Sequence, residues 1–468
     1  MISCLSKRVV RWILVLGVVL ALLICSHQLV SDYGYKEALG EMASRPYKWY
    51  TAGGSTPAQS SNGTAPATDL QSGTAPDAYN DILALLQTPL VDKKSLDEKV
   101  LDELLRERKQ LYVDALKKPI TEPKVAGLIR AGEKRTGSAN AAILSLVRNE
   151  DLDDIIGSIL ELEEQFNGDF QYPYVFLNDG EFTSQFKDAI LRALPQGRKV
   201  EFGTIDPELW DMPSDIDEQE FKERMEKLNG IQHADQVSYH NMCRFYSKAF
   251  YHHPLMQKYK YAWRVEPGVH FYCKINYDVF QFMQASDKIY GYVLNLYDSP
   301  ESIETLWVKT LDFLKEHPSY LNEKGAHEWI RDNVQKPRNY DMTKGYSTCH
   351  FWTNFEITDM DFLRSTIYEE FMVFLDSQKG FYYERWGDAP VRSLALALFA
   401  DKSRIHWFRD IAYTHFPYTN CPACPEDSTR CNGDCKPGLF VPWDNLEVEN
   451  CQPTWIKYEM SQEDLDMY

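Results

Sequence analysis

The feature of this sequence that most constrains its fold is the alternation of short apolar runs with helically spaced segments from residue 139 onward. Apolar runs typical of buried strands occur at residues 141–147, 174–177 and 199–202. Helical spacing of apolar residues occurs between these runs, at residues 153–166 and 186–194. Further strands are predicted at 261–265, 351–355 and 405–408, and a helix at 391–399. Such strand–helix–strand units predict an α/β fold whose mixed, largely parallel central sheet is flanked by helices.

Composition excludes two broad classes of protein. Hydrophobic residues make up 44% of the 468 residues, which excludes wholesale disorder. The 50 Lys and Arg residues against 69 Asp and Glu residues give a net charge of −19. A general nucleic-acid binder needs a basic surface, so we expect no nucleic-acid partner.

The first thirty residues predict a membrane anchor. Residues 12–25 are uninterruptedly apolar, and residues 12–30 together are long enough for a helix that crosses a thin bilayer. The basic residues Lys7, Arg8 and Arg11 precede the segment, which places residues 1–11 in the cytosol and the rest of the chain in the lumen. A cleaved signal peptide and a buried helix are the alternatives, but the segment lacks a good small-residue cleavage site.

Residues 31–136 are predicted to be a stem between this anchor and a lumenal domain at 137–468. Residues 51–76 are nearly all Ser, Thr, Ala, Gly and Pro, which is typical of a flexible spacer, and they include a glycosylation sequon at Asn62. A helical segment follows, and Ser95 with Glu98 forms a capping-box pattern at its start. Its apolar stripe fits either a coiled-coil stalk that dimerises the protein or a helix packed on the flank of the domain.

The cysteines indicate an oxidising compartment. Of the 10 cysteines, those predicted to be lumenal are Cys243, Cys273, Cys349, Cys421, Cys424, Cys431, Cys435 and Cys451. We expect these to form disulfides that staple a Cys-rich C-terminal tail to the domain. A zinc site in the tail is the alternative, but the spacing of the cysteines fits it poorly.

Glu266 is a candidate metal ligand. It follows the strand predicted at 261–265, and ligands of parallel sheets bind beyond the carboxyl ends of the strands. A hard divalent cation such as Mn²⁺ or Mg²⁺ takes one or two carboxylates together with phosphate oxygens. Arg264 lies two positions before Glu266 and so shares its face of the strand. A solvated turn glutamate is the alternative.

Three further residues are candidates, each with a structural alternative. Glu356 lies among Phe, Trp and Ile, where a carboxylate is costly unless it is paired or used; the alternative is the polar face of an edge strand. Asp388 precedes the helix at 391–399 and can either cap it or bind a hydroxyl group. His415 can be a packed or exposed histidine or a nitrogen ligand of Mn²⁺. Four short Asp-x-Asp strings are ascribed to helix capping and chance in an acidic chain.

Six stretches carry a resemblance to a known family: AAILSLVRNEDL, SYHNMCRFYS, YAWRVEPGVHF, STCHFWTNFEI, YYERWGDAPVRSLA and AYTHFPY. Over residues 139 to 420 the sequence resembles the fungal Golgi α-1,2-mannosyltransferases of glycosyltransferase family 15. The resemblance implies a GT-A-like nucleotide-sugar-binding fold, a GDP-mannose donor, and Mn²⁺ or another divalent cation. It also implies transfer to a mannoside with retention of anomeric configuration, by a single-pass type II protein of the Golgi membrane.

The resemblance further implies roles for matching residues. Glu266 and His415 are implied as metal ligands, and Glu356 as the nucleophile. Contacts with the donor or acceptor are implied for Tyr239, Arg264, Arg148 and Asp388.

Retention leaves two mechanisms open. Glu356 can attack the sugar in a double displacement, or it can support an oxocarbenium-like centre while the acceptor attacks from the leaving-group face. In either case we expect an enzyme that extends O-linked or N-linked mannose chains of cell-wall glycoproteins. A non-catalytic mannan-binding protein with the same fold is the alternative function.

Overall fold

The structure is a computed structural model that describes residues 76–95, 97–133, 138–423, 431, 435 and 449–468. Residues 71–468 form one unit. The predicted cytosolic tail, the membrane anchor at 12–30, the spacer and Asn62 lie outside the described residues. Among the helices that are described, none has the length and apolar character needed to cross a membrane.

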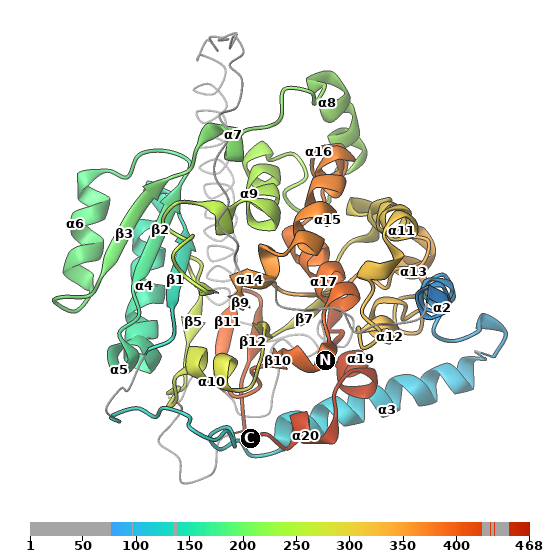
Figure 1. The fold of residues 1–468 in the computed structure, drawn as a ribbon, viewed down its shortest axis with the longest axis horizontal. Helices are drawn as coiled ribbons and strands as arrows, with labels where there is room; N and C mark the ends of the chain where they lie inside the picture. Colours follow the sequence, from blue (N-terminus) through green and yellow to red (C-terminus); the bar gives the residue numbers. More distant parts are fainter. Residues whose placement is uncertain (1–75, 96, 134–137, 424–430, 432–434, 436–448) are drawn as a thin grey trace, which may run out of the picture. The chain divides into compact units, whose positions relative to one another are not determined.

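A sheet of seven strands lies at the centre of the described residues, in the order β10-β6-β9-β4-β1-β2-β3 (Figure 1). The strands are β1 (Ala141–Leu146), β2 (Tyr174–Asn178), β3 (Val200–Thr204), β4 (Tyr261–Arg264), β6 (Tyr290–Tyr292), β9 (Glu356–Asp359) and β10 (Ile405–Trp407). Parallel pairing joins β1 to both β2 and β4, β2 to β3, and β6 to β10. Only β9 runs antiparallel to its neighbours in this sheet, which are β4 and β6. The prediction of a mixed, largely parallel sheet is confirmed.

Helices cover both faces of this sheet. In the described part of the chain they are α2 (Pro76–Leu86), α3 (Glu98–Lys117), α4 (Leu152–Leu162), α5 (Gly168–Phe170), α6 (Ser184–Ala193), α7 (Pro207–Trp210), α8 (Glu218–Lys227), α9 (Val237–Lys248), α10 (Val279–Ala285), α11 (Leu306–Glu316), α12 (His327–Ile330), α13 (Pro337–Met342), α14 (Met360–Leu363), α15 (Thr366–Ser377), α16 (Gly380–Tyr383), α17 (Asp388–Phe399), α19 (Gln452–Tyr458) and α20 (Gln462–Leu465). Trp263 of β4 packs 5.1 Å from the ring of Phe166, in the turn after α4. The next residue, Arg264, lies over Tyr246 of α9. Because consecutive strand residues point to opposite faces, these contacts place helices on both sides of β4.

The remaining described strands form two small sheets. One contains β5 (His270–Phe271), β11 (Tyr413–His415) and β12 (Tyr418–Asn420), and the other pairs β7 (Asn295–Tyr297) with β8 (Cys349–Phe351). The strand predicted at 351–355 is therefore wrong in its extent. Strand β8 ends at Phe351, a turn follows, and β9 of the central sheet begins at Glu356. Most of the aromatic run is therefore the turn that connects β8 in one sheet to β9 in another.

Helix α3 packs against α19 on the flank of the domain, which agrees with one of the two alternatives for this segment. Arg108 of α3 donates to Asp332 at 2.8 Å, and both side chains are buried. The predicted cap is wrong, because the side chain of Asp97 accepts from the backbone N–H of Val100 at 2.9 Å and forms the N-cap. Ser95 instead ends a separate short 3₁₀ turn.

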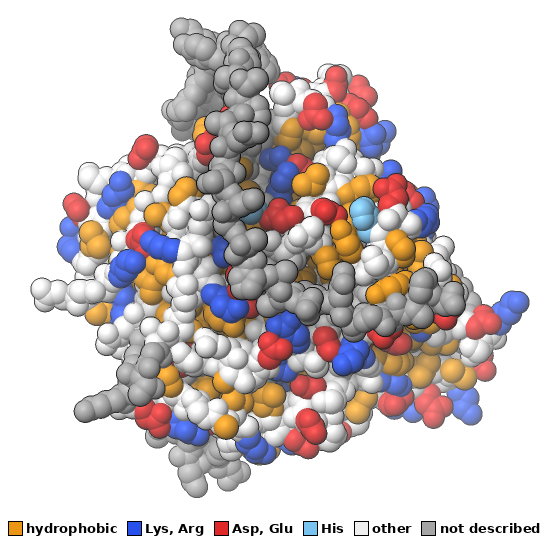
Figure 2. Space-filling view, in the orientation of Figure 1, with side chains coloured by type: hydrophobic (Ala, Val, Ile, Leu, Met, Phe, Trp, Pro, Cys, Tyr) orange, Lys and Arg blue, Asp and Glu red, His pale blue; other side chains and the backbone are white. Residues whose placement is uncertain are grey.

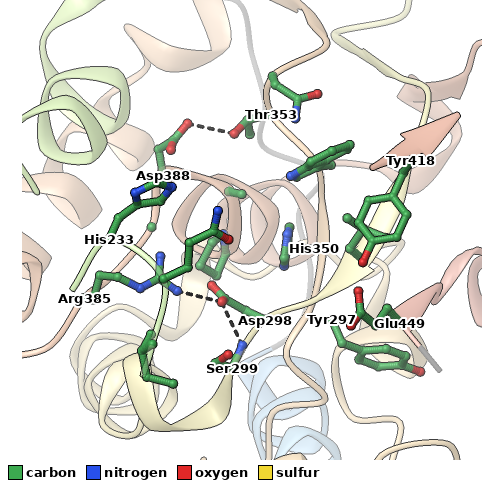
Figure 3. A pocket seen from close by; sticks show the side chains of 18 of the residues that line it. His233, Tyr297, Asp298, Ser299, His350, Thr353, Arg385, Asp388, Tyr418 and Glu449 are labelled. Atoms are coloured by element: carbon green, nitrogen blue, oxygen red, sulfur yellow. Dashed lines mark hydrogen bonds and ion pairs between the residues drawn. The ribbon is translucent and has the colours of Figure 1, made fainter. Parts of the chain in front are cut away.

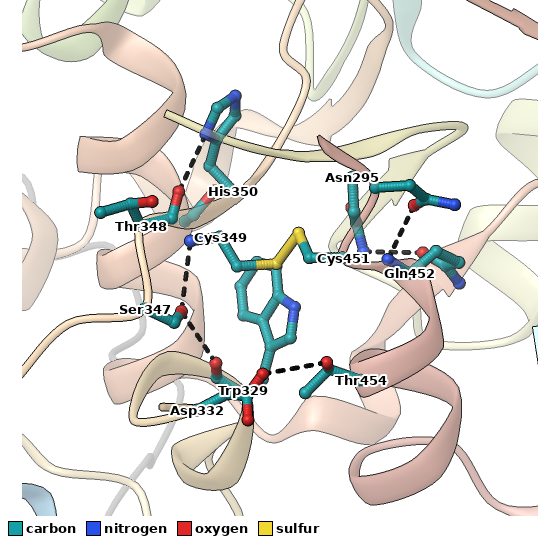
Figure 4. Close-up of a disulfide and its surroundings, with 12 residues drawn as sticks. Asn295, Trp329, Asp332, Ser347, Thr348, Cys349, His350, Cys451, Gln452 and Thr454 are labelled. Carbon is teal, nitrogen blue, oxygen red and sulfur yellow. Dashed lines mark hydrogen bonds between the residues drawn. A yellow bond between two sulfur atoms is a disulfide. The ribbon is translucent and has the colours of Figure 1, made fainter. Parts of the chain in front are cut away.

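The disulfide prediction is confirmed in part. Cys349 of β8 bonds to Cys451 at the start of α19 (Figure 4), and the other bonds among the described residues are Cys273–Cys431 and Cys421–Cys435. The zinc alternative is wrong for these cysteines. The pairing expected for Cys243 is also wrong, because this residue is buried in α9 with a free thiol. Cys424 lies outside the described residues.

Charged side chains of both signs are interspersed on the face shown in Figure 2. On this face the described residues form no continuous basic stripe of the kind that a general nucleic-acid binder uses. The expectation of no nucleic-acid partner rests on the net charge of −19.

The buried Arg108–Asp332 pair predicts how firmly α3 is held. Arg108→Met should lower the free energy of unfolding by about 3–5 kcal/mol, because it leaves a buried carboxylate unpaired. The exposed Arg106 on the same helix is the matched control, and Arg106→Met should change this free energy by less than about 0.5 kcal/mol. Urea unfolding of the soluble domain measures both. Equal stability of the two variants would show that the ion pair does not hold α3.

Candidate active site

The candidate site lies at the edge of the central sheet where β1 and β4 end. Strand β4 ends at Arg264, and Glu266 lies two residues further along the chain. Because β9 is antiparallel to β4, its first residue, Glu356, lies beside Arg264 in register. The one antiparallel strand therefore brings a distant carboxylate to the edge where the parallel strands end.

The small sheet brings His415 to the same edge. Strand β5 follows β4 after a short loop, and Thr414 of β11 pairs with His270 of β5. His415 is the last residue of β11, and its Nε2 atom lies 3.7 Å from Oε2 of Glu266. The two predicted metal ligands, far apart in the sequence, are thus neighbours.

Arg264 is the centre of the charged cluster. Its Nε atom donates to Oε1 of Glu266 at 2.8 Å, and its Nη1 atom donates to Oδ2 of Asp388 at 2.6 Å. The guanidinium lies 3.5 Å from the ring centroid of Tyr246, and the residue is only 4% exposed. Burial opposes the charge, but Glu266 and Asp388 outweigh it and hold the pKa of Arg264 well above its usual value.

A cavity of about 740 Å³ opens onto this cluster (Figure 3). The predicted site residues that line it are Tyr239, Arg264, Glu266, Asp388 and His415. Asp388 is the first residue of α17, and its Oδ2 atom also accepts from Oγ1 of Thr353 at 2.8 Å. The cavity therefore has carboxylate, imidazole and guanidinium groups on one continuous wall.

Glu356 lies behind this wall. It is 1% exposed and is not among the residues that line the cavity. The edge-strand alternative is wrong, because β9 lies between β4 and β6. Burial raises the pKa of Glu356 above its usual value, and the nearby charges of Arg392 and Arg264 oppose that rise. Nε of Arg392 is 3.5 Å from Oε2 of Glu356.

Tyr239 and Arg148 are placed differently. Tyr239 of α9 lines the cavity, stacks on His233 with ring centroids 4.7 Å apart, and accepts from Nη1 of Arg385 at 3.4 Å. Burial raises the pKa of Tyr239 well above its usual value. The side chain of Arg148 is 62% exposed, pairs with Asp151 at 2.9 Å, and is not among the lining residues. Its role in nucleotide binding stays a prediction.

The sequence analysis missed polar residues that also line the cavity: Asp298, His350 and Arg385. Arg385 falls within the stretch YYERWGDAPVRSLA, three positions before Asp388. Asp298 follows β7 directly, and the rule that inspects polar residues after strands would have found it had β7 been predicted.

Glu266 and His415 fit a divalent cation that is held together with a ligand. Oε1 of Glu266 is engaged by Arg264, and Oε2 faces His415. One carboxylate and one imidazole suit Mn²⁺. Among the described residues no group of three or more His, Cys, Asp or Glu side chains could hold a metal ion. A cation here would need its other ligands from phosphate oxygens and water.

The raised pKa of Glu356 predicts a stability cost at neutral pH. A carboxyl group whose pKa is raised by folding stabilises the fold while it is protonated, and this contribution is lost as the pH rises through the raised pKa. Glu356→Gln should therefore melt at a higher temperature than the unsubstituted protein at pH 7. The difference should disappear as the pH falls towards the ordinary value of 4.5.

Calorimetry across this pH range measures the effect. Glu181 is exposed, so Glu181→Gln is the matched control and should change the melting temperature at pH 7 little. A Glu356→Gln protein that is less stable than the unsubstituted protein at pH 7 would contradict the electrostatic analysis.

Comparison with known proteins gives close matches. The profile of the family described as "Glycolipid 2-alpha-mannosyltransferase" matches residues 99–460. The chain is 55% identical over 468 residues to the "Probable mannosyltransferase KTR4" of Saccharomyces cerevisiae, and the match covers 99% of each chain.

Two solved structures are similar. The X-ray structure of the mannosyltransferase Ktr4p from S. cerevisiae in complex with GDP is 61% identical, with a TM-score of 0.82, and the match covers 84% of this chain and 100% of that chain. The Mn/GDP form of core-mannan synthase A from Aspergillus fumigatus is 43% identical, with a TM-score of 0.70, and the match covers 74% of this chain and 93% of that chain.

Proposed function

The chain belongs to the glycolipid 2-alpha-mannosyltransferase family, and from this premise we propose that it transfers mannose from GDP-mannose to a mannoside acceptor. The transfer forms an α-1,2 linkage with retention of anomeric configuration. The acceptors are mannose-terminated O-linked or N-linked glycans of cell-wall glycoproteins, and the domain has a GT-A-like fold.

One observation carries the mechanistic part of this proposal: Glu266 and His415 face one another at 3.7 Å on the wall of the cavity. The similar structure from A. fumigatus is described as a Mn/GDP form, which supports Mn²⁺ as the cation of this pair. Mn²⁺ bound there would offset the negative charge that develops on GDP as the sugar–phosphate bond breaks.

The residues around this pair have distinct tasks. Arg264 holds the carboxylates of Glu266 and Asp388 in place through two hydrogen bonds. Tyr239 lines the cavity with a neutral hydroxyl, because burial raises its pKa, and so can bind a phosphate or sugar oxygen of the donor. Asp388 binds the acceptor or the reacting sugar.

The position of Glu356 favours one of the two roles left open by the sequence. A nucleophile needs a direct path to the anomeric carbon, but Glu356 is buried behind Arg264 and Asp388. Oε2 of Glu356 also lies 3.5 Å from Nε of Arg392, with which it forms an ion pair. These features favour a supporting electrostatic role for Glu356, with attack of the acceptor on the leaving-group face of the sugar.

The proposed location is the Golgi membrane, with residues 12–30 as a single-pass type II anchor and the domain in the lumen. The apolar run that follows Lys7, Arg8 and Arg11 supports this orientation. The disulfides Cys273–Cys431, Cys349–Cys451 and Cys421–Cys435 support an oxidising lumenal environment.

The direct test is an activity assay. The soluble domain incubated with GDP-mannose, Mn²⁺ and methyl α-mannoside should yield an α-1,2-linked disaccharide, identified by NMR. Product of the opposite anomeric configuration would contradict retention. Binding of mannosides without transfer would favour the non-catalytic alternative.

The proposed metal pair makes a second prediction. His415→Ala should lower kcat/KM by about 100-fold or more and weaken the Mn²⁺-dependent binding of GDP. His270 on neighbouring β5 is a matched control, because its imidazole is half exposed and pairs with Glu161 at 2.9 Å instead. His270→Ala should retain both properties. Rates at varied Mn²⁺ concentration and calorimetric titration of GDP measure the effect, and unchanged Mn²⁺ dependence in His415→Ala would exclude this pair as the metal site.

A further inference from the structure

A second carboxylate lies on the cavity wall beside Asp388. Asp298 follows β7, and Nη2 of Arg385 donates to its Oδ1 atom at 2.9 Å (Figure 3). Both residues line the cavity, and Arg385 is buried. The sequence and the comparisons assign no role to this pair.

Each carboxylate has one oxygen held by the protein and one left over. Oδ1 of Asp298 accepts from Arg385 and, at 2.8 Å, from the backbone N–H of Ser299. Oδ2 of Asp388 accepts from Arg264 and Thr353. Within the described residues no hydrogen bond reaches Oδ2 of Asp298 or Oδ1 of Asp388. These oxygens remain available to a ligand in the cavity.

Gly387 brings the two carboxylates together. It directly precedes Asp388, and a Cβ atom built on it would lie 3.8 Å from Oδ2 of Asp298. Asp298 therefore reaches the backbone on which Asp388 is mounted. The absence of a side chain at Gly387 leaves Oδ2 of Asp298 uncovered on this side, whereas a Cβ atom here would also lie 3.2 Å from Cδ of Pro390.

The chemistry of this wall fits a neutral, hydroxyl-bearing ligand. Carboxylate oxygens accept hydrogen bonds from hydroxyl groups and repel the phosphates of the donor. His350 adds to the same wall: its Nδ1 atom lies 3.3 Å from the carbonyl oxygen of Thr348, which can only accept. Burial lowers the pKa of His350, so the neutral ring offers Nε2 as a further acceptor.

The wall is also held rigidly. The backbone N–H of Asp298 donates to the carbonyl of Thr348 at 2.9 Å. Arg385 is fixed to Ser302 twice, through its backbone N–H at 3.0 Å and its Nη2 atom at 2.9 Å. A binding group fixed in advance loses little conformational entropy when its ligand arrives.

We infer that Asp298 and Gly387 form, together with Asp388, the subsite that binds the hydroxyl groups of the acceptor mannoside, and that Arg385 is the positioning residue of Asp298. This inference rests on the proposed function and specifies where its acceptor lies. It makes Asp298 a determinant of which sugar is accepted.

The test compares methyl α-mannoside with its 3-, 4- and 6-deoxy forms as acceptors. In the unsubstituted protein, removal of the hydroxyl that Asp298 binds should lower kcat/KM by about 10-fold or more, because a hydrogen bond to a charged group is lost. In Asp298→Asn the penalty for that same deoxy sugar should fall to about twofold, while the penalties for the others stay unchanged. A merely structural role would weaken all acceptors in proportion.

Two further variants complete the design. Gly387→Ala should raise the KM for methyl α-mannoside, because the methyl group would lie 3.8 Å from Oδ2 of Asp298, where it would hinder a hydroxyl group, and 3.2 Å from Cδ of Pro390, at the start of the helix that carries Asp388. Asp332→Asn is the matched control, because Asp332 is also a buried aspartate paired with an arginine, and it should leave the pattern of deoxy penalties unchanged.

The outcomes separate the inference from the proposed function. Calorimetric titration should give Asp298→Asn the same affinity for GDP as the unsubstituted protein. A changed GDP affinity, or an unchanged deoxy pattern in Asp298→Asn, would overturn the subsite. Failure of the unsubstituted protein to glycosylate methyl α-mannoside at all would overturn the proposed function and the subsite with it.

Discussion

The buried guanidinium of Arg264 is the interaction on which the rest of the site depends. A cation at this depth loses most of its hydration, and the two carboxylates of Glu266 and Asp388 and the ring of Tyr246 compensate for that loss. The same contacts fix β4 to α9 and α17. Arg264 therefore serves both the stability of the fold and the site. Removal of either carboxylate would leave the buried charge of Arg264 less compensated and would disturb the position of the other carboxylate as well.

The antiparallel strand β9 and the small sheet serve the same purpose by different routes. A purely parallel sheet would present only residues that follow strands at this edge. Strand β9 runs the other way, so its first residue, Glu356, lies at this edge. The pairing of β11 with β5 brings His415, the last residue of β11, to the same edge from another sheet. The cavity thus collects side chains from segments separated by long stretches of sequence; Arg264 and Asp388, for example, are 124 positions apart.

The sequence predicts most of the central sheet, because buried parallel strands leave continuous apolar runs that are separated by helices. The sequence-based prediction fails where one residue pattern fits more than one local structure. The aromatic run at 351–355 has the composition of a single strand, but only Phe351 belongs to a strand, β8, and the remaining residues form the turn that leads to β9. Glu266, Asp388 and His415 were found from their positions and from the family resemblance. Asp298 was not, because the three-residue strand β7 that it follows was not predicted, and Arg385 was not, because its partner Asp298 is 87 positions away in the sequence.

The packing of α3 against α19 has a consequence for how the protein is made. Arg108 of α3 contacts Thr454 of α19, although the two residues are 346 positions apart. Trp455 of α19 lies 5.0 Å from Trp329 and 5.1 Å from Phe351, so the same helix also seals the core beneath β8. During vectorial synthesis the ribosome delivers α3 long before its partner emerges. The nascent domain must wait with an uncovered apolar flank, and this interval is when it depends most on the chaperones of the compartment that receives it.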